Sequence, residues 1–247
     1  ARLLKDHIAY GSFTDNGWQK DFVQPGQYFT KDVLYHSKSL MLRLGNKEKL
    51  PLEFEFGLLM ATQFGGDRYL KLEDGSTEKV LDMPENLKAY WKALFPQAGG
   101  DDTPYGEQTN VEGNMLGSWN FALNYYVGQW KFRAYLEHYF EDHSQMFWEY
   151  GRWKDGQIGL EITFPKNRWI TSAVWEGLST KDQTGPSLYN SFEGQFPEYQ
   201  ISGLDDYYNH YIYGAWQHQG MGMGNPLIPG PAYNTDHNIT FRSNRVR

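Results

Sequence analysis

The sequence predicts an all-β fold, an antiparallel β-barrel that spans a membrane, and three observations support this prediction. The first is an alternation of apolar and polar side chains with a period of two residues, which recurs in at least eight segments. The segment 52–56 has apolar residues on one face of a strand and two glutamates on the other, and 119–125, 130–134 and 158–164 follow the same pattern. A water-soluble sandwich can show this alternation, whereas a transmembrane barrel with a polar lumen requires it.

The second observation is the aromatic content. The 247 residues include 9 Trp, 18 Tyr and 15 Phe, which together make 17% of the chain. Such an excess has two physical uses. Amphipathic rings form girdles at membrane interfaces, and aromatic platforms stack on the apolar faces of sugars.

The third observation is the length of the strand-like runs, most of which have about 8–12 residues and therefore suit the ~9–11 residues of a tilted bilayer crossing. Ordinary globular strands average nearer ~5–6 residues. About ten such runs are expected. They lie at 4–13, 37–45, 52–62, 115–127, 129–140, 143–153, 156–164, 168–178, 210–219 and 236–246.

The connections between these runs are either short or long. Short turns are expected near 45–49, 127–129, 154–156 and 165–167, and long connections at 14–36, 63–114 and 179–209. This pattern is typical of outer-membrane barrels, which have short periplasmic turns and long external loops. We expect 63–114 to be a long external loop that contains one short helix at 84–95.

The expected helix is amphipathic, and Asp82 is a candidate for its N-cap. Its apolar residues at three- and four-residue spacing share one face. These residues are Leu87, Tyr90, Trp91 and Leu94. The last run, 236–246, reads as a strand in progress, so we expect one barrel domain over 1–247 that is incomplete at both ends, because an open sheet edge cannot remain in hydrocarbon.

Composition excludes several classes of function. The net charge of −7 and the lack of a basic stripe argue against nucleic acid as a partner. The chain has no cysteine, and therefore no disulfide framework, thiol nucleophile or cysteine-based metal site. We find no catalytic motif, and Asp101–Asp102 and Asp205–Asp206 do not fit a calcium-loop pattern. We therefore expect no catalytic residue, no metal and no cofactor.

The polar strand faces carry charges of both signs. In a barrel they would point into the lumen and pair with one another, although a solvated, selective path is the alternative. The expected network consists of Arg43, Glu53, Glu55, Lys131, Arg133, Glu137 and Glu161. Glu53 and Glu55 would lie roughly 7 Å apart by strand geometry, a separation at which glycosidases hold their two carboxylates. A soluble β-rich glycoside hydrolase therefore stays open as an alternative.

Aromatic rings and small polar groups gather between 205 and 216, and this mixture is the chemistry of sugar recognition. Rings stack on C–H faces, while carboxylate and amide groups bind hydroxyls. The candidate glycan-binding residues are Asp205, Asp206, Tyr207, Tyr208, Asn209, His210 and Trp216. The alternative interpretation is an aromatic girdle at a strand end. The glycine-rich stretch 220–224 has no phosphate-loop lysine and is expected to fold tightly over the barrel mouth.

Eight stretches in order along the chain resemble the Wzi-like capsule assembly family of outer-membrane proteins. They are YHSKSLMLRLG at 35–45, FGL at 56–58 followed by QFGG at 63–66, GNMLGS at 113–118, YFEDH at 139–143, EGLSTKDQTGP at 176–186, DYYNH at 206–210 and GNPL at 224–227. The resemblance implies a Gram-negative outer-membrane barrel of about eighteen strands. It also implies binding of capsular polysaccharide at the cell surface, without catalytic activity. Family members are roughly twice as long, so the chain resembles their central-to-later portion.

The expected function is therefore the binding of surface or capsular polysaccharide, and its assembly or retention at the cell surface. Expected partners are this polysaccharide and outer-membrane lipid, with other outer-membrane proteins as further candidates. A structural barrel subunit of a larger outer-membrane complex is the second alternative to glycan binding.

Overall fold

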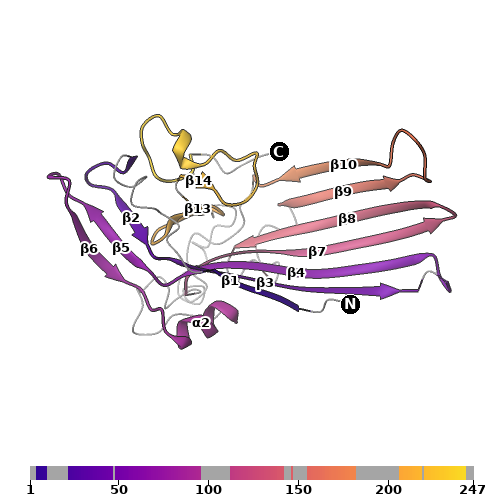
Figure 1. Ribbon diagram of the computed structural model, residues 1–247, viewed down its shortest axis with the longest axis horizontal. Helices are drawn as coiled ribbons and strands as arrows, with labels where there is room; N and C mark the ends of the chain where they lie inside the picture. The colour runs from indigo at the N-terminus through magenta and orange to yellow at the C-terminus, as the bar shows by residue number, and fades with distance from the viewer. Residues whose placement is uncertain are drawn as a thin grey trace, which may run out of the picture.

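The computed structural model describes residues 4–9 (as backbone), 22–46, 48–95, 112–141, 146, 155–181, 206–218 and 220–242. The predicted antiparallel, all-β architecture is confirmed in these ranges. The largest unit is a seven-stranded antiparallel sheet (Figure 1). Its strands, in spatial order, are β1 (Leu4–Ala9), β3 (Leu34–Gly45), β4 (Leu52–Phe64), β7 (Asn114–Val127), β8 (Trp130–Glu141), β9 (Gly156–Thr163) and β10 (Ser172–Ser179).

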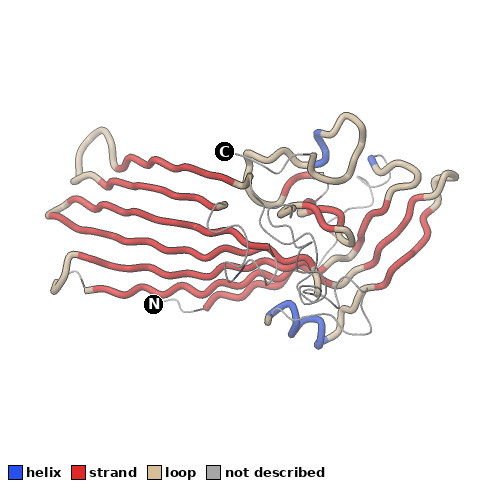
Figure 2. The backbone as a smooth tube through the Cα atoms, turned by 180° about the vertical axis from the view of Figure 1, so that it is seen from behind, coloured by secondary structure: helices blue, strands red, loops and turns tan. Residues whose placement is uncertain are grey.

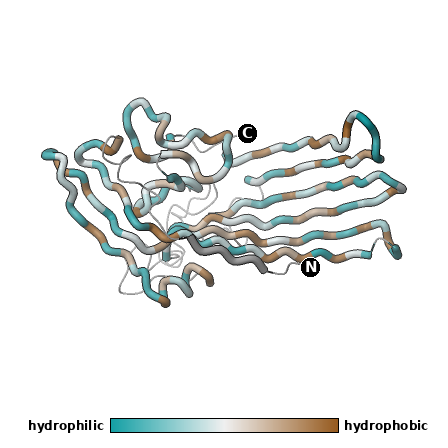
Figure 3. Tube along the Cα trace, viewed as in Figure 1, coloured by the Kyte–Doolittle hydropathy of each residue, from teal (hydrophilic) through white to brown (hydrophobic). Residues whose placement is uncertain are grey.

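The register of this sheet keeps the polar residues of neighbouring strands on one face. Glu55 of β4 lies opposite Arg43 on one side and Ala122 on the other. Arg133 of β8 lies opposite Asn124 and Glu161. All seven residues of the predicted charge network therefore share a face, which we call the polar face. Figure 3 shows the underlying alternation of hydropathy along the long strands.

The opposite, apolar face of the sheet exposes large side chains toward the end with the short turns. Figures 1 and 2 show this end as a single layer of strands. In an ordinary soluble sandwich such residues would pack against a second sheet. The exposed residues on this face include Leu44 (65% exposed), Phe54 (40%), Leu123 (47%), Leu160 (54%) and Trp175 (57%).

The other end of the sheet carries smaller elements. A three-stranded sheet is formed by β2 (Tyr28–Lys31), β5 (Asp67–Lys71) and β6 (Thr77–Asp82), and helix α2 (Leu87–Leu94) follows it. The long connection expected at 63–114 therefore contains the end of β4, a hairpin and the helix. Likewise, the connection expected at 14–36 contains β2 and the start of β3. The helix is capped by Asn86, whose side chain accepts from the Ala89 amide, and not by Asp82, which ends β6.

The predicted strand at 210–219 is wrong. This region contains only short pairs: β11 (Asn209–His210) with β12 (Gly214–Ala215), and β13 (Gln217–His218) with β14 (Met221–Gly222). The chain turns back between the members of each pair. Gly214 and Gly220 adopt φ of 77° and 78°, in the left-handed region that interrupts a continuous strand. The strand predicted at 143–153 lies outside the described residues except for Met146.

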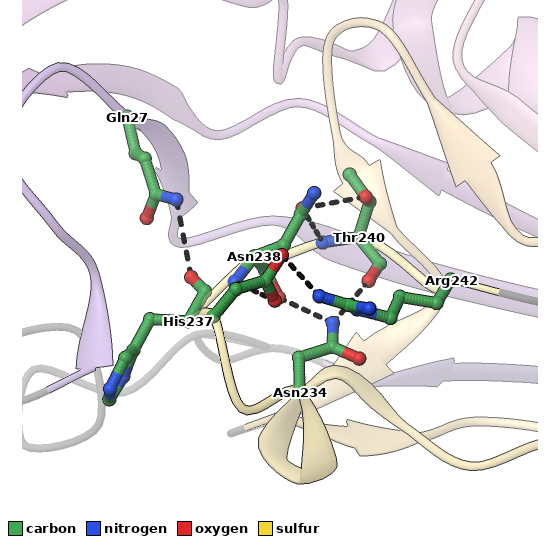
Figure 4. Close-up of polar contacts among 7 residues, drawn as sticks. Gln27, Asn234, His237, Asn238, Thr240 and Arg242 are labelled. Atoms are coloured by element: carbon green, nitrogen blue, oxygen red, sulfur yellow. Dashed lines mark hydrogen bonds and ion pairs between the residues drawn. The ribbon is translucent and has the colours of Figure 1, made fainter.

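The strand predicted at 236–246 is also not found over 236–242, the part of it that the structure describes. A 3-10 turn, Pro231–Tyr233, precedes this region. Asn234 donates through Nδ2 to the Asn238 and Thr240 carbonyls at 2.6 and 2.7 Å (Figure 4). Asn238 in turn accepts from the Thr240 amide at 3.0 Å. These side chains occupy backbone groups that a strand ladder would need, so the segment folds as consecutive turns.

Candidate functional site

A cavity of about 510 Å³ lies between the polar face of the large sheet and residues 206–228, which we call the cap segment. Ring contacts and hydrogen bonds join the two parts. The rings of Tyr35 and Trp216 meet edge to face at 6.4 Å, and the Tyr207 hydroxyl donates to Asp155 at 2.9 Å. The cavity is lined by Tyr35, Leu59, Ala61, Leu116, Gly117, Ser118, Glu137, Tyr139, Phe140 and Thr180 on one side, and by Tyr207, Tyr208, Trp216, Met223, Gly224, Asn225, Pro226 and Ile228 on the other.

The floor of the cavity is built by polar-face residues of β3, β4, β7 and β8. Ser118 lies opposite Leu59 on one neighbouring strand and opposite Tyr139 on the other. The Glu137 carboxylate accepts from Ser118 Oγ at 2.7 Å and from the Tyr139 hydroxyl at 3.4 Å. The floor therefore offers hydrogen-bonding oxygens beside tyrosine side chains.

The roof is held by Tyr208 of the cap segment. Its hydroxyl accepts from the Asn225 amide at 2.9 Å, and its ring packs on Phe241 with centroids 5.2 Å apart. Gly224 has φ +148°, and a Cβ there would lie 2.4 Å from the Tyr208 hydroxyl oxygen, so the close approach requires glycine. Burial raises the pKa of Tyr208, which keeps the phenol neutral and able to donate.

Trp216 is the most informative residue of the site. It is only 2% exposed and lines the cavity, yet its indole Nε1–H has no hydrogen-bond partner among the residues that the structure describes. Leaving a buried donor unsatisfied costs about 1–3 kcal/mol. A buried donor of this kind needs a hydrogen-bond partner, which an ordered water or a ligand oxygen can supply. A hydroxyl or carbonyl oxygen in the cavity would satisfy this donor.

Three of the candidate glycan-binding residues, Tyr207, Tyr208 and Trp216, line the cavity, and two others build the local fold. Asp206 accepts from the Asn209 side chain at 2.8 Å and from its amide at 3.4 Å. Asn209 also accepts from the Phe241 amide at 2.7 Å and donates to its carbonyl at 3.0 Å. These bonds use the oxygens that were expected to bind sugar hydroxyls. Asp205 lies outside the described residues.

His210 also serves the fold of the cap segment. Its Nδ1 accepts from the backbone amides of Ile212 and Tyr213 at 3.2 and 3.4 Å. Burial, with a smaller contribution from the positive charge of Arg68, lowers the pKa of His210 to about 3. The imidazole is therefore neutral at physiological pH and acts as an acceptor for the turn.

Sequence reasoning missed most of the cavity lining. Tyr35, Ser118, Tyr139 and Asn225 were not singled out, and Glu137 was assigned only to the charge network. The alternation places Ser118, Glu137 and Tyr139 on polar positions of the predicted strands, and that was the available signal; Tyr35 falls in the connection expected at 14–36 and Asn225 outside every predicted strand. Their gathering depends on the strand register, which alternation leaves open.

The predicted charge network is partly formed, on the same face as the cavity floor. Glu55 makes ion pairs with Arg43 at 2.8 Å and Arg133 at 2.6 Å, and Glu53 accepts from the Tyr126 hydroxyl at 2.6 Å. In contrast, the side chains of Lys131 and Glu161 make no hydrogen bond or ion pair with any described residue. Because two guanidinium groups favour the ionised form of Glu55, this carboxyl is poorly suited to donate a proton as the general acid of a glycosidase.

Comparison of the chain with protein-family models, with curated proteins and with solved structures gives no match. The described residues contain no group of three or more His, Asp or Glu side chains placed to hold a metal ion. Within the same ranges, no helix has the length and hydropathy needed to cross a membrane.

Proposed function

We propose that this chain forms part of a Wzi-like outer-membrane β-barrel that binds surface or capsular polysaccharide and helps retain it at the cell surface. The observation that carries the proposal is the tyrosine-lined cavity together with Trp216, which lines it and whose buried indole donor has no hydrogen-bond partner among the described residues. The cavity lies on the polar face, which would be the lumen side, and the cap segment would close the external mouth.

The membrane part of the proposal is supported by the exposed apolar face. β3, β4, β7 and β8 have 12, 13, 14 and 12 residues, enough for a tilted crossing that needs ~9–11. Ion pairs on the polar face would cross-link the lumen. An open edge is not stable in hydrocarbon, so the proposal requires strands other than the seven described to pair with β1 and β10.

The ligand part is supported by the chemistry of the cavity. Its volume of about 510 Å³ falls within the ~300–1,000 Å³ range of small-molecule sites. Rings of Tyr35, Tyr139 and Tyr208 can stack on a sugar, and Glu137 can accept from its hydroxyls. The Trp216 indole would donate to a ring or hydroxyl oxygen.

The experiment measures binding of oligosaccharides from capsular and surface polysaccharides to the detergent-solubilised protein by calorimetry. We expect Trp216→Phe, which keeps the ring shape but removes the donor, to weaken binding by about 5- to 30-fold, the equivalent of one hydrogen bond of ~1–2 kcal/mol. The same variant should melt at the wild-type temperature or higher, because an unsatisfied buried donor is removed. Binding to the wild type with unchanged affinity in Trp216→Phe would remove Trp216 from the site.

The matched control is Trp169→Phe, since Trp169 is 85% exposed in the turn between β9 and β10. This variant should bind like the wild type. If the wild-type protein binds none of the oligosaccharides, the glycan-binding proposal fails.

A further inference from the structure

Helix α2 turns its large apolar side chains away from the protein. Leu87 is 70% exposed and Trp91 51%, and Phe95, directly after the helix, is 57% exposed. The Trp91 and Phe95 rings stack in parallel at 5.9 Å. By contrast, Ala89 and Ala93 are only 2% exposed. A helix at a water-exposed surface normally buries its largest apolar residues, because burial of apolar area is what stabilises it.

The orientation of α2 is fixed by contacts on its inner side. Ala89 and Ala93 pack against Phe64 of β4. Lys92 is nearly buried and pairs with Glu112, which is also buried, at 2.5 Å. Rotating the helix to cover Trp91 would expose this packing and separate a buried ion pair, which is costly.

Helix α2 packs on the same face of the large sheet that exposes the apolar side chains. The helix contacts apolar-face positions of β3 and β4: Tyr90 packs edge to face on His36 at 5.6 Å, and Lys38 Nζ donates to the Ala93 carbonyl at 2.6 Å. From Lys38 toward the short turn, the apolar-face positions of β3 are Leu40, Leu42 and Leu44. The helix therefore lies where the apolar face begins, at the end of the sheet that carries the smaller elements (Figure 1).

We infer that α2 lies in the membrane interface at the rim of the barrel, with Leu87, Trp91 and Phe95 inserted among lipids. Because the alanine side of α2 packs on the apolar face, its opposite side points the same way as that face, so the same lipid would cover both. Tryptophan and phenylalanine are the side chains that favour the interfacial layer, and short amphipathic helices lie in its plane. The inference rests on the proposed membrane location of the sheet and adds a second lipid contact, outside the strands.

The chain has no cysteine, so single cysteines can carry a spin label without background. The full protein is reconstituted in vesicles of phosphatidylcholine and phosphatidylglycerol as Trp91→Cys, Glu78→Cys or Leu160→Cys. Collision with oxygen, which concentrates in lipid, is compared with collision with a water-soluble nickel chelate. Glu78 is an exposed position of β6 and serves as the aqueous reference, whereas Leu160 on the apolar face of β9 reports whether the sheet itself meets lipid.

We expect the oxygen-to-nickel ratio at Trp91→Cys to exceed that at Glu78→Cys and to approach that at Leu160→Cys. A ratio at Trp91→Cys equal to that at Glu78→Cys, with Leu160→Cys in lipid, would overturn the role of α2 and leave the barrel in place. Low collision with both reagents at Trp91→Cys would indicate a protein partner and would also overturn the inference. Aqueous values at both Trp91→Cys and Leu160→Cys would instead refute the membrane part of the proposed function.

Discussion

Lowering the pH should open the cap segment, because one of its turns depends on a neutral histidine. His210 Nδ1 accepts two backbone hydrogen bonds, from Ile212 and Tyr213. A proton on Nδ1 would remove this acceptor and place a charge in a buried setting near Arg68. Both effects agree with a pKa of His210 that is lowered from 6.5 to about 3 in the folded protein.

The size and sign of the effect follow from proton linkage. Below pH 6.5 the open segment binds a proton at His210, whereas the closed segment does not until the pH nears 3. The stabilisation is therefore complete above pH 6.5 and is lost progressively as the pH falls toward 3. At pH 5.0 the loss is about 1.5 pH units at ~1.4 kcal/mol each, or about 2 kcal/mol. The open population should rise roughly 30-fold relative to neutral pH.

Hydrogen exchange followed by mass spectrometry measures this opening in peptides that cover 207–216, at pH 7.5 and 5.0, after correction for the intrinsic pH dependence of exchange. His210→Gln replaces the titrating ring by an amide, so its opening should change little between the two pH values. His218→Gln removes a histidine whose side chain is exposed and should behave like the wild type. Equal protection of the wild type at both pH values, or the same pH effect in His210→Gln, would refute the reasoning.

Two further predictions concern the polar face of the large sheet. Glu55→Gln should lower the free energy of unfolding by about 1–3 kcal/mol, because Arg43 and Arg133 each lose a charged partner. Chemical denaturation of Glu55→Gln, Arg133→Gln and the double variant measures the coupling energy between the two side chains, and losses that simply add would contradict the ion pair. Gly159→Ala should lower the free energy of unfolding by about 1–3 kcal/mol, because its Cβ would lie 2.0 Å from Tyr135 Cζ. Gly177→Ala is the control and should melt like the wild type, since the atom nearest to its Cβ would be 3.6 Å away. Equal melting temperatures for the two alanine variants would contradict this packing.

The strand prediction succeeded where the two-residue alternation was long and uninterrupted. The runs at 52–62, 115–127 and 129–140 correspond to β4, β7 and β8 within two residues at each end. The run at 168–178 begins too early, since β10 starts at Ser172. Asn167 accepts from the Trp169 and Ile170 amides at 2.8 and 2.9 Å, so its side chain builds a turn where a strand was expected.

The predicted site was only partly correct because aromatic and polar side chains in one segment do not share one task. Tyr208 and Trp216 reach the cavity, whereas Asp206, Asn209 and His210 hold the turns that place them there. The composition of the segment is the same in either case. Which group remains free for a ligand depends on the hydrogen bonds that neighbouring backbone groups form first.

The sequence by itself determined which side chains share a strand face, because this depends only on the period of an extended chain. It also placed Leu87 and Trp91 on one side of α2, from the period of a helix. Only the tertiary structure decided which surfaces each face meets. Strand register gathered Ser118, Glu137 and Tyr139 under the cap segment, and the Lys92–Glu112 pair turned the apolar side of α2 outward. Periodicity is local, whereas register and rotation are set by residues far apart in the chain.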